Sequence, residues 1–75
     1  MVFANDIRKV ILTLAEKRGA GNSFYPVEVA KRLDPENWQA LIDQVHLVAD
    51  SLIQEGQISV SQSGRALEKA YTKKV

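Results

Sequence analysis

The 75-residue sequence contains no cysteine, two prolines, four glycines and a single histidine. Without cysteine the chain can form no disulfide and no thiolate metal site. No apolar run approaches the length of a membrane span, which needs about 20 residues. Neither positive nor negative residues are in clear excess, since ten basic and nine acidic residues leave a net charge of +1. This balance is unlike the strongly basic composition typical of many nucleic-acid-binding domains.

What is present is enough for one small folded unit. Apolar residues make up 45% of the chain, which supports one hydrophobic core but not two. We therefore expect a single domain over residues 1–75. Near the N-terminus, Asp6, Arg8 and Lys9 stand where a signal peptide would be apolar. A cytoplasmic location is therefore expected.

An apolar stripe near the N-terminus predicts the first helix. Apolar residues between Phe3 and Ala15 are spaced by three and four, which fits one face of a helix and does not fit a strand. Asn5 or a residue just before it is expected to cap the start of this helix. Gly19 is expected to end the helix, because glycine readily adopts the left-handed conformation found there.

A short extended piece and a second helix are predicted next. Residues 23–25 precede Pro26, and the residue before a proline is disfavoured in a helix. Pro26 itself fits the first helical position, because its missing N–H needs no partner there. The apolar side of this helix ends at Leu33. Asp34 is then expected to cap a third helix that opens at Pro35.

The third helical pattern is the longest and is predicted to form the centre of the core. Its apolar positions repeat at helical spacing for about four turns. They are Trp38, Leu41, Ile42, Val45, Val48, Ala49, Leu52 and Ile53. Trp38 is expected in the core because it begins this stripe. Gly56 is expected to stop the helix.

The pattern then changes to period two and predicts a β-hairpin over residues 58–71. Ile58 and Val60 alternate with polar residues, which is typical of a half-buried strand. Residues 63–64 supply a turn. The composition of residues 65–71 fits helix or strand, and a strand is favoured because a lone first strand would leave its hydrogen bonds unmade. The expected fold class is α+β and mainly helical, with three helices and a small C-terminal hairpin.

This order of elements is that of a winged helix, and the sequence resembles one family in more detail. The run at residues 26–35, Trp38, and the stretches 56–58 and 62–65 are similar to a family of small bacterial winged-helix proteins with no assigned function. The resemblance covers about residues 7–68. It implies the winged-helix fold and, by superfamily analogy, nucleic-acid binding.

Charge is distributed unevenly along the chain. Residues 1–32 carry a net charge of +3, residues 33–64 carry −5 without any lysine or arginine, and residues 65–75 carry +3. In a winged helix the third helix would enter the major groove of DNA. Acidic groups there oppose contact with phosphate. Any binding to DNA is therefore expected to be weak, poor in sequence information and made through the wing and the second helix.

Two binding hypotheses follow, and the first is a small regulatory or accessory protein that contacts DNA. Its candidate residues are basic, apart from one glutamine that could read a base. They are Lys31, Arg32, Gln39, Arg65, Lys69, Lys73 and Lys74. The alternative is a protein-interaction module that uses the acidic face of the third helix. Asp43 and Leu47 are its candidate residues, since Leu47 lies roughly opposite the core stripe and could seat a partner helix.

No motif supports catalysis, a metal ion or a cofactor. Residues 19–21 match part of a glycine-rich nucleotide-binding motif, but Phe24 replaces its third glycine and a helix precedes the loop where a strand is required. His46 has no second histidine or cysteine with which to share a metal. We expect it to be partly buried with one hydrogen bond. The sequence predicts a binding protein that is not an enzyme and has no membrane partner.

Overall fold

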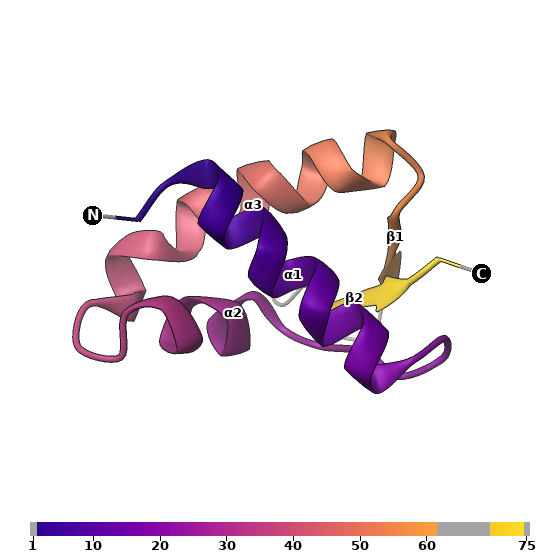
Figure 1. Cartoon of the computed structure of the whole chain (residues 1–75), viewed down its shortest axis with the longest axis horizontal. Helices are drawn as coiled ribbons and strands as arrows, with labels where there is room; N and C mark the ends of the chain where they lie inside the picture. Colours follow the sequence, from indigo (N-terminus) through magenta and orange to yellow (C-terminus); the bar gives the residue numbers. More distant parts are fainter. Residues whose placement is uncertain (1, 62–69, 75) are drawn as a thin grey trace.

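Three helices and a C-terminal hairpin make up the part of the chain that the computed structural model describes, residues 2–61 and 70–74. The elements follow in the order α1 (Ala4–Arg18), α2 (Pro26–Leu33), α3 (Trp38–Gln54), β1 (Ile58–Ser61) and β2 (Ala70–Lys73). In Figure 1, α1 runs diagonally across the view with α3 above it and α2 below it. This is the predicted α+β class, with a winged-helix-like layout.

Both ends of α1 are closed by local hydrogen bonds. The helix starts at Ala4 and its N-cap residue is Phe3, so the cap lies just before Asn5 and Asn5 itself is inside the helix. The Phe3 N–H donates to Asp6 Oδ2 over 3.0 Å, and the charge of Asp6 suits the positive end of the helix dipole. Gly19 ends the helix as predicted, with a positive φ of 75° that favours glycine.

Residues 23–25 form the predicted extended piece, which joins the hairpin. Phe24 makes an antiparallel bridge with Tyr71 of β2, and both N···O distances are 2.8 Å. Tyr71 also pairs with Val60 of β1, so β2 lies between β1 and the extended piece. Pro26 is the first residue of α2, as predicted.

The third helix begins later than the sequence predicts. Asp34 is the C-cap residue of α2, and its Oδ1 accepts the Asn37 N–H over 3.1 Å. This bond closes a turn over residues 35–37, so that Pro35 lies in the turn and α3 begins at Trp38. The expectation that Asp34 caps α3 and Pro35 opens it is wrong, because Asp34 ends α2 and its carboxylate closes the turn.

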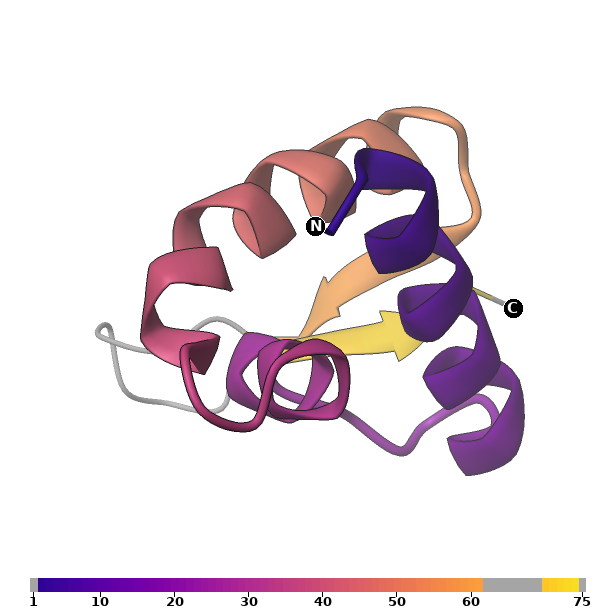
Figure 2. The same ribbon diagram turned by 60° about the vertical axis from the view of Figure 1, so that its left-hand side comes forward.

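The two strands form the predicted antiparallel hairpin, and Figure 2 shows them side by side with α1 to one side and α3 to the other. The register pairs Ile58 with Lys73, Ser59 with Thr72, Val60 with Tyr71, and Ser61 with Ala70. Strand β2 continues two residues beyond the predicted end at residue 71. Ile58 is buried but Val60 is 40% exposed, so β1 buries only part of its predicted apolar side. The predicted turn at residues 63–64 lies outside the described residues.

The core lies between the helices and the hairpin. Its largest fully buried side chains are Ile7, Ile11, Phe24, Val29, Val45, Leu52, Ile58 and Tyr71. Trp38 is only partly buried and packs against the edge of this cluster, with Lys31 Nζ 4.9 Å from the centroid of its ring. The prediction of a core tryptophan is therefore partly correct. Trp38 is the first residue of α3, so no preceding helical turn covers its ring.

Candidate functional site

The outer side of α3 is exposed along the whole helix. Its exposed residues, which we call the α3 face, are Gln39, Ala40, Asp43, Gln44, Leu47, Asp50, Ser51 and Gln54. They fall on one arc because successive helical residues advance by about 100°. The opposite arc supplies the buried Leu41, Val45, Ala49 and Leu52. The α3 face therefore carries two carboxylates and neither lysine nor arginine.

Leu47 lies at the centre of the α3 face. Its side chain is 68% exposed, which confirms the prediction that it points away from the core. Asp43 precedes it by four residues and Asp50 follows it by three, so each carboxylate lies about one turn away. The sequence hypothesis named Asp43 and Leu47 but left out Asp50. The seven-residue spacing from Asp43 to Asp50 was the signal that could have added it.

An ion pair holds the C-terminal end of α3 against α1. Arg8 donates through Nη1 to Glu55 Oε2 over 2.8 Å and through Nη2 to Glu55 Oε1 over 2.7 Å. These hydrogen bonds hold the pKa of Glu55 below its ordinary value. The Arg8 and Glu55 side chains are 37% and 44% exposed, so water screens the pair and it fixes the position of the helix end more than it stabilises the fold.

A second contact ties the edge of the α3 face to the hairpin. His46 Nδ1 lies 2.9 Å from Tyr71 Oη, and His46 is partly buried, as predicted. Burial raises the pKa of Tyr71 to about 12, and the negative charge of Asp50 acts in the same direction. At neutral pH the Tyr71 hydroxyl is therefore protonated and can donate to His46. This bond fixes α3 relative to β2.

Two of the basic residues predicted to contact nucleic acid are engaged elsewhere. Lys31 lies over the ring of Trp38, and Lys73 Nζ is 2.8 Å from Glu16 Oε1 of α1. The remaining candidates divide as follows: Arg32, Gln39 and Lys74 are exposed, whereas Arg65 and Lys69 lie outside the described residues. The carboxylate of Glu16 offsets the positive charge that Lys73 would offer to phosphate, and the ring of Trp38 covers one side of the Lys31 ammonium group.

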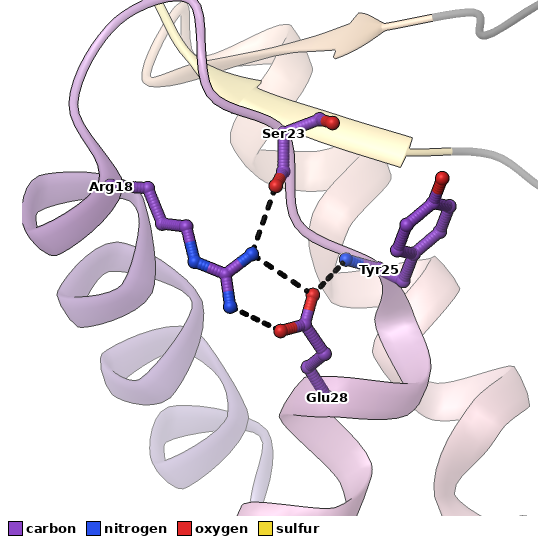
Figure 3. Close-up of polar contacts among 4 residues, drawn as sticks. All are labelled: Arg18, Ser23, Tyr25 and Glu28. Atoms are coloured by element: carbon purple, nitrogen blue, oxygen red, sulfur yellow. Dashed lines mark hydrogen bonds and ion pairs between the residues drawn. The ribbon is translucent and has the colours of Figure 1, made fainter.

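A polar cluster around Arg18 fixes the segment before α2 (Figure 3). Arg18 Nη1 donates to the Ser23 carbonyl over 3.0 Å and to Glu28 Oε2 over 3.2 Å, and Nη2 donates to Glu28 Oε1. Glu28 Oε2 also accepts the Tyr25 N–H over 2.9 Å. Burial would raise the pKa of Glu28, but the bonds from Arg18 and the Tyr25 N–H lower it below its ordinary value. The bond between Tyr25 and Glu28 is local to the start of α2, but residue spacing does not predict the contact of Arg18 with Glu28, which forms only when the end of α1 packs beside α2.

A shallow depression lies away from the α3 face, between α1 and α2. It has a volume of about 360 Å³ and is lined by Val2, Asp6, Lys9, Val10 and Leu33. Its one carboxylate already accepts the N-cap hydrogen bond of α1. Within residues 2–61 and 70–74, no three histidine, aspartate or glutamate side chains gather as a metal site. Among the helices in these ranges, none combines the length and the apolar character needed to cross a membrane.

Comparison with known proteins gives one family and no function. Residues 4–73 match a family model described as a protein of unknown function, DUF3253. The match confirms the predicted resemblance to a family without an assigned function, but it names neither the winged-helix superfamily nor a bacterial source. No curated protein matches the chain. The features of the molecule that bear on its function are therefore the α3 face and the charges around it.

Proposed function

We propose that this chain, which belongs to the DUF3253 family, is a protein-interaction module that binds its partner through the α3 face. One observation carries the proposal: a leucine that is 68% exposed lies between two aspartates on a helix face without a basic residue. A single exposed leucine needs no explanation, but this one is the central side chain of an otherwise polar and acidic surface. The proposed role is binding and not catalysis. The proposed location is the cytoplasm, as expected from the sequence.

The charge of the α3 face favours a protein partner over DNA. In the winged-helix-like layout, α3 takes the place of the helix that would enter the major groove. Asp43 and Asp50 would then approach the phosphate backbone and repel it. A protein surface can instead offer lysine or arginine to these carboxylates and an apolar side chain to Leu47.

Weak DNA binding through the wing and α2 is the second candidate function, and the winged-helix-like layout favours it. Kinship with the winged-helix superfamily is part of this candidate. Arg32 and Lys74 are exposed and could contact phosphate, whereas Lys31 and Lys73 would first have to leave Trp38 and Glu16. So few cations would give a salt dependence equivalent to about two to four neutralised phosphates.

A capture experiment with matched variants tests the proposed function. The wild-type protein, Leu47→Asp and Thr13→Asp are immobilised separately and incubated with extract of the source organism. Thr13 is exposed on α1, so Thr13→Asp adds the same charge outside the α3 face. We expect at least one protein to be retained by wild type and Thr13→Asp but lost with Leu47→Asp. If no retained protein depends on Leu47, the proposal is wrong.

An NMR titration with mixed-sequence duplex DNA separates the two candidates. Under the proposed function, amide signals between Gln39 and Gln54 stay unchanged at both low and moderate salt. Under the second candidate, signals of Arg32 and Lys74 shift at low salt, and Arg32→Glu removes the shift. Tight, sequence-selective DNA binding at physiological salt would contradict the charge argument for the α3 face.

A further inference from the structure

We propose that the partner segment is an α-helix that packs lengthwise on the α3 face, with basic residues seven apart on one flank of an apolar seam. This inference rests on the proposed function and adds the chemistry and conformation of the ligand. It follows from the positions of the exposed side chains around and along α3.

The first observation is a regular seam on the α3 face. Its residues are spaced alternately by four and three: Ala40, Gln44, Leu47, Ser51 and Gln54. Two helices pack side by side along their length at this spacing; in this seam Ala40 and Leu47 are apolar, and the other three residues are polar. Ala40 and Ser51 are small, so a partner helix could approach closely on either side of Leu47. Leu47 would supply the apolar contact at the middle of the seam.

The second observation is that both carboxylates flank this seam on the same side. Asp43 immediately precedes Gln44, and Asp50 immediately precedes Ser51, so each occupies the same place in consecutive seven-residue repeats. In a pair of packed helices this place is next to the seam and faces charged residues of the partner. The two positions are about 10 Å apart along the axis, at about 1.5 Å per residue. A helix with lysine or arginine at positions i and i+7 matches that distance.

A helical ligand fits the α3 face better than an extended one. An extended segment gains affinity from main-chain hydrogen bonds to a sheet edge, but the interior N–H and C=O groups of α3 are already bonded within the helix. Side-chain packing and charge pairing must therefore supply the binding energy. A second copy of this chain is not the expected ligand, because its own Asp43 and Asp50 would then lie near these carboxylates and repel them.

The test uses three synthetic 21-residue peptides of identical net charge and the intact protein at 0.15 M salt. The first is an alanine-rich helix with a leucine seam and two lysines, seven apart, on one flank. The second moves both lysines to the side opposite the leucines, and the third replaces a central alanine of the first with proline. Affinity is measured by fluorescence anisotropy and the binding surface by amide chemical shifts. We expect the first peptide to bind about tenfold more tightly than the second, because each of two exposed ion pairs contributes a few-fold.

Matched protein variants then assign the effect to the two aspartates. Asp43→Asn with Asp50→Asn should weaken the first peptide about tenfold. Asn5→Lys with Thr13→Lys makes the same change in net charge on exposed positions of α1 and should leave the affinity within about twofold. Asp43→Lys with Asp50→Lys should instead prefer a peptide in which glutamates replace the two lysines.

The outcomes separate this inference from the proposed function. If the first two peptides bind with equal affinity, or if the proline peptide binds as tightly as the first, the inference of a helical basic ligand is wrong. If Leu47-dependent capture from extract persists in that case, the proposed function stands and only the nature of the ligand is wrong. If neither a peptide nor a Leu47-dependent protein binds, both are wrong.

Discussion

Stability at alkaline pH should depend on one hydroxyl group, that of Tyr71. The side chain is 1% exposed, its ring centroid lies 6.1 Å from that of Phe24, and its hydroxyl is bonded to His46. Burial, aided by the charge of Asp50, raises its pKa from 10.0 to about 12. The folded protein therefore holds this proton more tightly than the unfolded chain does. The contribution to stability is complete below pH 10 and is lost as the pH rises toward 12.

The size of this effect follows from the pKa difference. A change from 10.0 to about 12 corresponds to about 2.7 kcal/mol of unfolding free energy, at 1.36 kcal/mol for each tenfold change in proton affinity. That is a large part of the stability of a domain of this size, which is of order 5 kcal/mol. Tyr71→Phe removes the titrating group and the hydrogen bond to His46. It should cost about 1 kcal/mol at pH 7 and lose much less stability than wild type between pH 10 and 12.

Urea unfolding followed by far-ultraviolet circular dichroism at pH 7, 10, 11 and 12 measures both effects. Any effect of alkali on the rest of the molecule is common to both proteins, so the informative quantity is the difference in unfolding free energy between wild type and Tyr71→Phe at each pH. We expect the variant to be the less stable protein at pH 7 and the more stable one near pH 12. Parallel losses of stability in the two proteins would refute the assignment of the alkaline effect to Tyr71.

Three further substitutions test the packing described above. Trp38→Ala should lower the unfolding free energy by about 2 kcal/mol in urea titration, less than for a fully buried tryptophan, because its ring is only partly covered; a loss of 4 kcal/mol or more would place it in the core. Arg18→Ala should lower the melting temperature and speed hydrogen exchange at the Phe24 amide, since Arg18 holds the Ser23 carbonyl; unchanged exchange would show that the cluster does not fix this segment. Leu47→Asp should change the unfolding free energy by no more than about 0.5 kcal/mol, and a larger loss would mean that Leu47 is buried.

Local patterns in the sequence were sufficient for most of the secondary structure. Gly19 and Gly56 end α1 and α3 with positive φ angles, because glycine lacks the side chain that makes this conformation costly. Pro26 opens α2 because its ring presets the helical φ and its missing N–H costs nothing there. The same local reasoning failed at Pro35. Asp34 could serve either neighbouring helix, and the bond from the Asn37 N–H decided in favour of a turn.

In the candidate site, too, local sequence patterns predicted some features and tertiary packing decided others. The sequence by itself placed Leu47 and Asp43 outside the core, since helical periodicity assigns each residue of a long amphipathic helix to a face. Only the tertiary structure decided which charges remain available, because ion pairs form between residues far apart in the chain. Lys73 meets Glu16, and Arg8 meets Glu55, only after the hairpin and α3 have packed against α1. The position of Trp38 at the edge of the core was likewise decided by packing, because periodicity gives the direction of a side chain but not the depth to which its neighbours cover it.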